Sequence, residues 1–366
     1  MVAAAVRSAV WPCRKPIDCA DQWSAPTHGD AACPIGTSPV GTFLPAKAGS
    51  YGAWRSVTVP DMLVFTHPAC LGHDPGIDHP ESPERLRVVL EALRAAFPDR
   101  LDWREAPPVK LGELVRVHDR ALIDDLLQPQ REPLRRIDLD TFTSPGSASA
   151  ALHAAGAGVA AVTAVMDGPD RRAFCAVRPP GHHATTDTAM GFCLFNNIAV
   201  AAAHALDAHG LERVAIVDFD VHHGNGTQAI FLADSRVAYC STHQSGLFPQ
   251  SGNMRERGTG NIRNILLPPG SGGFRFRNTW ADELLPQLDA FGPQLLLVSA
   301  GFDGHMRDPQ ADLMLEAEDF GWLSSELATL ATRHAGGRMV SMLEGGYDLQ
   351  ALRECSVAHV RALLDG

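Results

Sequence analysis

Four short apolar segments lie between residues 173 and 343, and each is followed directly by polar residues. They cover residues 173–177, 214–217, 295–298 and 339–343. Apolar runs of this length are typical of strands buried on both faces of a parallel sheet. Because the intervening stretches are long enough to form helices, the pattern predicts an α/β domain in which these strands share one sheet.

Earlier in the chain, residues 62–65 predict a first strand, and a helix follows it. Ser82 and Pro83 match the N-cap and N1 preferences of a helix start. We expect residues 79–82 to form a surface loop before that helix. Its buried stripe is expected to contain Leu86, Val89, Leu90 and Leu93.

Two further segments concern architecture rather than chemistry. Residues 148–165 are rich in Ala and Gly, which allows a helix to pack closely on the sheet. Residues 268–273 predict a turn and not a phosphate-binding loop, because no Gly-Lys-Ser/Thr sequence follows them.

The N-terminal segment differs from the rest of the chain. Residues 1–58 hold Ala, Pro, Gly and Ser with no sustained period, so we expect a poorly ordered extension before a folded domain at residues 59–366. Arg7 interrupts the apolar run of a targeting peptide, and disorder is the favoured interpretation. The spacing of Cys13, Cys19 and Cys33 matches no zinc pattern. Met62 is left open as an alternative start.

Composition excludes several classes of protein. With 366 residues, 45% hydrophobic and 20% charged, the chain can bury one large core. Its formal net charge of −11 argues against a nucleic-acid partner. No apolar stretch reaches the roughly 18 uninterrupted residues of a membrane span. The eight cysteines are irregularly spaced, so we expect a cytoplasmic protein with reduced thiols. A homo-oligomer is compatible with this sequence.

The polar residues after the predicted strands have metal-ligand chemistry. Asp220 and His222 lie two residues apart, so both side chains point to one side of the chain at the strand end. Asp303 follows another of the apolar runs. Two carboxylates and one imidazole provide three protein ligands, which suits a catalytic Zn²⁺ with an open position for water or substrate.

The other two strand ends contribute groups that move protons. His182 and His183 follow the run at 173–177, and Tyr347 follows the run at 339–343. Ligands of open parallel sheets bind at the carboxyl ends of the strands. We therefore expect a metal, two histidines and a tyrosine to meet in one pocket.

Taken together, these segments resemble the histone deacetylase family. Asn225, where class I members carry Asp, and HPESPER at 79–85 favour the class II-like branch, which includes bacterial histone-deacetylase-like amidohydrolases and acetylpolyamine amidohydrolases. The resemblance covers roughly residues 62 to 366. Its motifs are RPPGHHA at 178–184, GFCLFNN at 191–197, VDFDVHHGNG at 217–226, SAGFD at 299–303 and EGGY at 344–347.

The resemblance implies a three-layer α/β/α arginase-deacetylase fold around a mainly parallel eight-stranded sheet, with residues 59–366 as the catalytic domain. It identifies Asp220, His222 and Asp303 as ligands of one Zn²⁺ per chain. The implied function is hydrolysis of N-acetyl amides, on a small acetylated amine or on acetyl-lysine in a protein, to acetate and the free amine. Zn²⁺ would make a hydroxide-like nucleophile available near neutral pH.

The remaining catalytic roles are also implied by the resemblance. His183 would take a proton from water and return it to the leaving amine, a task suited to imidazole. His182 would act beside it as an electrostatic partner held by Asp218, and Asn225 would orient His183. Tyr347 would donate a hydrogen bond to the tetrahedral oxyanion.

Two further sites follow from the same resemblance. Phe192 and Phe248 match the rings that flank the family's acyl-lysine tunnel, and Gly191 could offer a carbonyl to the substrate nitrogen. We expect His223 and Cys193 to be packing residues. A monovalent cation such as K⁺ is implied beside the metal. Its implied ligands are Asp218, Asp220, His222 and Ser241.

Three alternatives remain. Gly224 and His305 occupy the positions where the arginase branch needs aspartates for a second metal, which argues against guanidine hydrolysis. Gln310 lies where polyamine-selective relatives carry an acidic gate, so a dedicated acetylpolyamine amidohydrolase is less favoured. A non-catalytic acyl-lysine binding protein is the third alternative, and the tandem histidines and Tyr347 argue against it.

Overall fold

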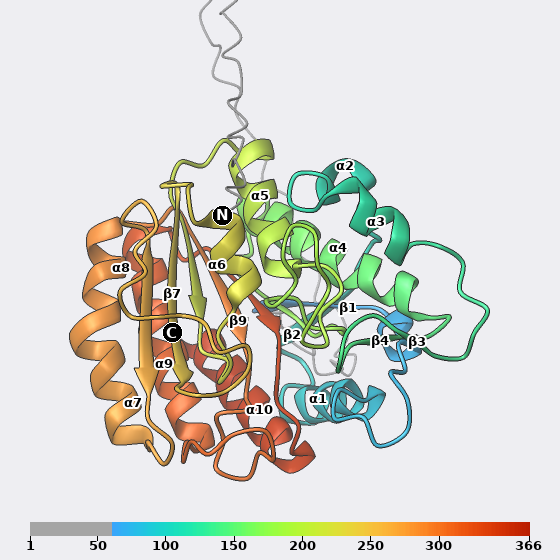
Figure 1. Cartoon of the computed structure of the whole chain (residues 1–366). Helices are drawn as coiled ribbons and strands as arrows, with labels where there is room; N and C mark the ends of the chain where they lie inside the picture. Colours follow the sequence, from blue (N-terminus) through green and yellow to red (C-terminus); the bar gives the residue numbers. More distant parts are fainter. Residues whose placement is uncertain (1–60) are drawn as a thin grey trace, which may run out of the picture. The chain divides into compact units, whose positions relative to one another are not determined.

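The computed structural model describes residues 61–366, and its centre is one eight-stranded sheet in which every pair of neighbouring strands is parallel (Figure 1). The strand order is β2-β1-β5-β10-β9-β6-β7-β8. The predicted parallel sheet is therefore confirmed. Its strands are β1 (Met62–Thr66), β2 (Leu101–Glu105), β5 (Arg172–Cys175), β6 (Val214–Asp218), β7 (Val237–Gln244), β8 (Ile262–Leu267), β9 (Leu295–Ala300) and β10 (Met339–Leu343).

The four strands predicted to deliver chemistry are adjacent in this order: β5, β10, β9 and β6. Because all run in the same direction, their carboxyl ends meet at one edge of the sheet. The antiparallel pair β3 (Arg135–Arg136) and β4 (Phe142–Thr143) lies outside the main sheet.

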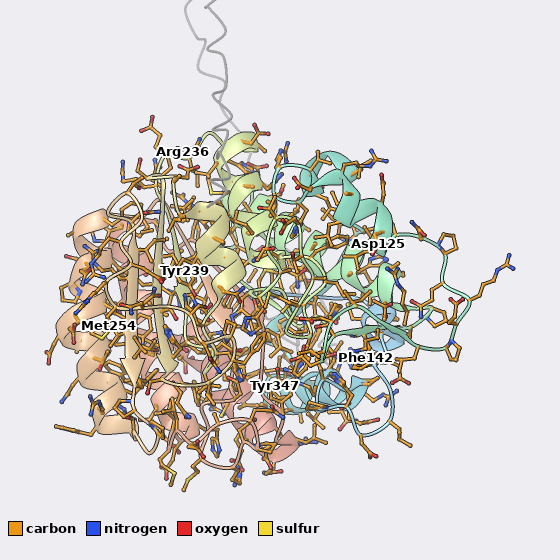
Figure 2. The ribbon with its side chains drawn as sticks, viewed as in Figure 1. Asp125, Phe142, Arg236, Tyr239, Met254 and Tyr347 are labelled. Carbon is orange, nitrogen blue, oxygen red and sulfur yellow. The ribbon has the colours of Figure 1, made fainter. Side chains whose placement is uncertain are left out.

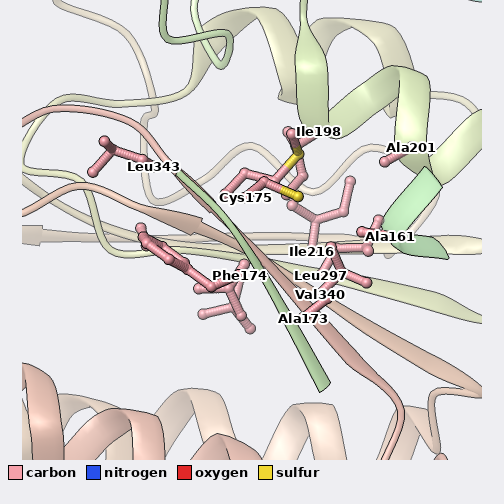
Figure 3. Close-up of a cluster of buried hydrophobic side chains, with 14 of the residues drawn as sticks. Ala161, Ala173, Phe174, Cys175, Ile198, Ala201, Ile216, Leu297, Val340 and Leu343 are labelled. Carbon is pink, nitrogen blue, oxygen red and sulfur yellow. The ribbon is translucent and has the colours of Figure 1, made fainter. Parts of the chain in front are cut away.

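Helices cover both faces of the sheet, which gives the predicted three layers (Figure 3). Ala161 and Ile198 come from the layer of α4 and α5, whereas the Phe174 ring packs against His359 of α10 on the opposite face. The helices are α1 (Pro83–Ala96), α2 (Leu111–Leu114), α3 (Arg120–Leu126), α4 (Ser147–Asp167), α5 (Asn197–Ala208), α6 (Asn225–Phe231), α7 (Gly273–Thr279), α8 (Leu285–Phe291), α9 (Ala317–His334) and α10 (Leu349–Asp365), with a 3₁₀ turn at Pro68–Gly72 and a π turn at Trp280–Leu284.

The Ala/Gly-rich segment forms α4, and its close packing is confirmed. A Cβ atom at Gly156 would lie 1.9 Å from the carbonyl oxygen of Pro107, and one at Gly158 would lie 3.1 Å from Met342 Cε of β10 in the sheet. Among the residues that the structure describes, α4 is the one helix long and apolar enough to cross a bilayer. However, 61% of its most apolar window is buried inside the protein, as in the core helix of a globular domain.

Helix α1 begins at Pro83 with the predicted buried stripe, and the loop at residues 79–82 before it is partly exposed except at Glu81. Glu81 is fully buried, and so are Arg85 and Arg178. The Glu81 carboxylate accepts hydrogen bonds from Arg178 Nη2 at 2.6 Å and from Arg85 Nη1 at 2.8 Å. A carboxylate paired with two guanidinium groups can be buried, and sequence pattern alone does not reveal such partners.

The remaining architectural predictions concern thiols and the N-terminus. Within the described part of the chain, the five cysteines are free and buried. Residues 268–273 contain the predicted turn, closed by Ser271 N–H donating to Pro268 O at 3.1 Å, and lead into the start of α7. The predictions for residues 1–58, including Cys13, Cys19 and Cys33, lie outside the described residues.

Candidate active site

Asp220, His222 and Asp303 converge at the carboxyl ends of β6 and β9. One ligand atom from each lies within 4.8 Å of the others. His222 Nδ1 is 3.2 Å from Asp220 Oδ1 and 3.2 Å from Asp303 Oδ2. Among residues 61–366 this is the only group of three or more potential ligands with such spacing.

Backbone groups hold both carboxylates in place. Val221 N–H donates to Asp303 Oδ1 at 2.9 Å, and Gly345 N–H donates to Asp220 Oδ2 at 2.8 Å. These bonds leave Asp220 Oδ1 and Asp303 Oδ2 facing His222. The ligand atoms are thus oriented by the fold itself.

The charges in this group favour a bound cation. Both aspartates are fully buried. Burial and the neighbouring Asp220 raise the pKa of Asp303 to about 7, because two buried carboxylates repel each other. A divalent cation would neutralise this repulsion, and two oxygens with one imidazole nitrogen suit Zn²⁺ with an open position. The residues present therefore fit the expected metal.

His182 and His183 are adjacent in sequence but have opposite electrostatic environments. His182 Nδ1 lies 3.0 Å from Asp218 Oδ2. Burial disfavours its charge, but Asp218 and Asp220 outweigh that effect and raise the pKa of His182 to about 10. Burial and the positive charge of His182 instead lower the pKa of His183 well below its usual value. The arrangement separates a charged imidazole from a neutral one.

The hydrogen bonds of His183 define its tautomer. Its Nδ1 lies 2.8 Å from Asn225 Oδ1. Because an amide oxygen can only accept, Nδ1 carries the proton and Nε2 keeps its lone pair. Asn225 therefore orients His183 without adding charge, and a neutral imidazole with a free nitrogen can accept a proton.

Tyr347, which is labelled in Figure 2, lies at the end of the loop at residues 344–347 that follows β10. Gly345 has no room for a side chain, because a Cβ atom there would lie 2.0 Å from Asp303 Oδ2. Gly346 has φ +121°, which disfavours residues with a Cβ. Arg85 Cζ lies 4.8 Å from the centre of the Tyr347 ring. Tyr347 therefore lies beside Arg85 in a loop that also contacts the metal ligands through Gly345 N–H.

The three residues expected in the substrate tunnel lie around His183 and Tyr347. A Cβ atom at Gly191 would be 2.5 Å from His183 Cδ2 and 2.8 Å from Phe248 Cε1. The Phe248 ring packs edge-on to His183 with centroids 5.0 Å apart, and the Phe192 ring packs edge-on to Tyr347 at 5.8 Å. Gly191 therefore keeps the space between the rings and His183 free.

Phe192 adopts φ +67°, which is uncommon for a non-glycine residue. Its N–H donates to Thr141 Oγ1 at 3.0 Å, and its ring packs edge-on to His79 at 4.7 Å. The segment between α3 and α4 and the loop before α1 therefore both support this aromatic wall, a role that the sequence did not reveal.

Two of the residues implied for a monovalent cation, Asp220 and His222, belong to the metal-ligand group, and the other two lie in the adjacent strands β6 and β7. Asp218 is paired with Ser241 across β6 and β7, and both are fully buried. Asp218 Oδ2 accepts from Tyr239 Oη at 3.0 Å, and Asp218 Oδ1 accepts from Asp220 N–H at 3.2 Å. Ser241 Oγ lies 3.0 Å from His243 Nδ1. Binding of K⁺ at this position stays a prediction.

The positions needed for a second metal carry no carboxylate. A Cβ atom at Gly224 would lie 2.2 Å from Asp218 Oδ2, so an aspartate does not fit there. His305 instead accepts a hydrogen bond from Arg307 N–H through Nδ1. This arrangement disfavours a two-metal site of the arginase kind.

His223 and Cys193, expected as packing residues, are both buried and hydrogen bonded. His223 lies 2.7 Å from Ser251 Oγ and 2.9 Å from Gln228 Oε1, and Cys193 Sγ–H donates to Gly191 O at 3.3 Å. Neither belongs to the metal-ligand group.

Comparisons with known proteins identify the family to which the chain belongs. Residues 79–363 match the histone deacetylase domain. The chain is 38% identical over 301 residues to a histone deacetylase-like amidohydrolase of Pseudomonas aeruginosa, covering 81% of this chain and 78% of that protein. It is 37% identical over 295 residues to a probable deacetylase of Archaeoglobus fulgidus, covering 79% and 81%.

A solved structure agrees with these sequence matches. The crystal structure of the HDA15 HD domain aligns with a TM-score of 0.79 at 34% identity, covering 83% of this chain and 88% of that chain. The matched residues include the metal-ligand group, the paired histidines and Tyr347. The chain therefore belongs to the histone deacetylase family.

Proposed function

We propose that this protein is a Zn²⁺-dependent deacetylase that binds one Zn²⁺ per chain. It hydrolyses the amide bond of an N-acetylated amine and releases acetate and the free amine. The observation that carries the proposal is a neutral His183 with a free Nε2, whose ring centre lies 6.0 Å from that of His222 in the three-residue metal-ligand group. A protein that only binds acyl-lysine does not need a proton acceptor at this position.

The residues divide the chemistry among them. When bound, Zn²⁺ would polarise the acetyl carbonyl and make the attacking water more acidic. His183 Nε2 accepts a proton from that water as the new C–O bond forms. It then returns the proton to the amine nitrogen as the C–N bond breaks. His182, kept charged by Asp218, stabilises negative charge in the pocket.

Tyr347 stabilises the same charge from a second direction. Burial raises the pKa of Tyr347 well above its usual value, so the phenol keeps its proton and can donate it in a hydrogen bond. A donor aimed at the tetrahedral oxyanion lowers the barrier more than it strengthens substrate binding.

The proposed substrate is an acetyl group on a narrow aliphatic stem, such as acetyl-lysine. The rings of Phe192 and Phe248 would contact the methylene groups of that stem. The neutral Gln310 favours acetyl-lysine over a dedicated acetylpolyamine substrate. A panel of acetyl-lysine peptides and acetylpolyamines, compared by kcat/KM, tests this substrate preference. A higher kcat/KM for the acetylpolyamines would contradict the preference for acetyl-lysine.

Tyr347→Phe tests the reaction itself. The change removes one hydroxyl that is not a metal ligand, so Zn²⁺ content and peptide binding should stay close to wild type. Turnover should fall on the order of 10²- to 10³-fold, because one oxyanion donor is lost. The measurement is acetate release from an acetyl-lysine peptide, with metal content determined in parallel. A wild type that binds the peptide but turns over no faster than Tyr347→Phe would be a binding protein.

A further inference from the structure

The loop that carries Tyr347 needs support from outside itself. Gly345 and Gly346 precede the tyrosine, and glycine allows a wide range of backbone angles. An oxyanion donor must be held in place before the reaction to be effective. The contacts on both sides of this loop therefore decide where the Tyr347 hydroxyl lies.

Arg85 holds the carbonyl groups on one side of the loop. Its Nε donates to Gly346 O at 2.6 Å, and its Nη2 donates to Glu344 O at 2.5 Å. Arg85 is fully buried, and Glu81 pairs with its guanidinium group. This contact fixes the start of the loop but not the N–H groups at its end.

Asp308 binds those N–H groups. Its Oδ2 accepts from Tyr347 N–H at 2.6 Å and from Asp348 N–H at 3.1 Å. Its Oδ1 accepts from Gln310 N–H at 3.0 Å, and its own N–H donates to His305 O at 2.8 Å. Asp308 is only 5% exposed, so these hydrogen bonds are shielded from water.

The contacts of Asp308 are not needed to start helix α10. Asp348 is the N-cap of that helix, and its side chain accepts from Ala351 N–H at 2.7 Å. The helix therefore has its own cap. The N–H groups bound by Asp308 belong to Tyr347 and Asp348, which precede the first helical residue, Leu349.

We propose that Asp308 is a positioning residue that sets the orientation of the Tyr347 hydroxyl by binding the backbone at the end of the Gly-Gly-Tyr loop. This inference rests on the proposed deacetylase function for its kinetic consequence, but its structural consequence can be measured without turnover. Asp308 makes no contact with the substrate in this scheme.

The kinetic test is a double-mutant cycle of Asp308→Ala and Tyr347→Phe in the full chain. Asp308→Ala alone should lower kcat for an acetyl-lysine peptide about 10- to 100-fold, with KM changed less than about 3-fold. In the Tyr347→Phe background the same change should lower kcat less than about 3-fold, because the hydroxyl is already absent. Equal losses in both backgrounds would overturn the inference.

The second test observes the tyrosine directly. The chain has three tyrosines, so ¹⁹F NMR of protein labelled with 3-fluorotyrosine should give few resonances. The spectrum of Tyr347→Phe assigns the Tyr347 resonance. In Asp308→Ala that resonance should shift or broaden, while Tyr239, whose hydroxyl donates to Asp218, should keep its resonance. An unchanged Tyr347 resonance would refute the proposal whether or not the wild type has deacetylase activity.

Two variants control for general disruption. Asp312→Ala changes an exposed aspartate in the segment between β9 and α9 that also contains Asp308. The Asp312 side chain accepts from Gln244 Nε2, and its removal should leave kcat and the Tyr347 resonance unchanged. Asp308→Asn keeps the size of the side chain but only one acceptor oxygen, so a smaller shift is expected. If Asp308→Ala also moves the Tyr239 resonance, Asp308→Asn decides the question, and an unshifted Tyr347 in that variant contradicts the proposal.

Discussion

Strands β6 and β2 both end in charged residues at the same edge of the sheet, but in opposite environments. Asp218 and Asp220 at the end of β6 are fully buried and bound by histidines and backbone N–H groups. Arg104 and Glu105 at the end of β2 are exposed, and Arg104 Nε donates to Asp102 Oδ2, earlier in the same strand, at 2.8 Å. Water screens this second pair, whereas burial strengthens the electrostatic effects around the first.

The position of each strand explains the difference. β6 lies between β9 and β7, whereas β2 is an edge strand that pairs with β1 alone. Loops from several strands enclose the end of β6, and the end of β2 remains open to solvent. Residue type after a strand is therefore insufficient to create a reactive site, and enclosure by neighbouring strands is also required.

The largest expected effect comes from removing a carboxylate at the enclosed end of the sheet. Asp303→Ala should lose both the bound Zn²⁺ and measurable acetate release, because only two of three protein ligands remain. Elemental analysis of the purified protein measures the metal. His305→Ala is the matched control and should retain one metal per chain. Two metals per wild-type chain would contradict the single-zinc site.

The next largest effect concerns the neutral histidine. His183→Ala should lower kcat/KM by about 10²- to 10⁴-fold, the range of general acid–base catalysis, with Zn²⁺ content unchanged. Acetate release from an acetyl-lysine peptide measures the rate. A loss below about 10-fold would mean that another group moves the proton, and would weaken the contrast between the adjacent histidines.

Glu81→Ala tests how much the buried ion pairs of Glu81 contribute to stability, apart from catalysis. It should lower the free energy of unfolding by about 3–5 kcal/mol, because Arg85 and Arg178 would remain buried without their carboxylate partner. Denaturant unfolding monitored by circular dichroism measures the change. A loss below about 1 kcal/mol would show that water or rearrangement compensates these charges.

The pKa of Glu81 predicts how its contribution to the free energy of unfolding depends on pH. Burial alone would raise the pKa of Glu81, but Arg178, His73 and Arg85 hold it well below its usual value. Its folded pKa thus lies below its unfolded pKa. The stabilisation is therefore present above the unfolded pKa and is lost as pH falls through the lower folded pKa. In the Glu81→Ala variant this acid-dependent contribution should be absent.

The smallest effect is expected at the open end of the sheet. Arg104→Ala removes an exposed ion pair with Asp102 and should change the free energy of unfolding by less than about 0.5 kcal/mol. Deacetylation should proceed at the wild-type rate. A rate loss above about 3-fold would show that charges at β2 influence the site, and the comparison with β6 would fail.

Several features could be predicted from sequence because they depend on local pattern. The apolar runs located β5, β6, β9 and β10, and the spacing of Asp220 and His222 placed two ligands at one strand end. The helix signals at Ser82 and Pro83 identified the start of α1. Each of these depends on residues that are close together along the chain.

Tertiary structure alone decided the environment of these residues. The insertion of β10 between β5 and β9, the burial of Glu81 between two arginines and the binding of the Tyr347 backbone by Asp308 join distant segments. The opposite charge preferences of His182 and His183 also arise this way, because Asp218 of β6 lies beside His182, whereas burial and the neighbouring charge of His182 disfavour a charge on His183. Burial and electrostatic interactions depend on every group nearby in space, so a local pattern can identify a ligand or a histidine but cannot determine its pKa.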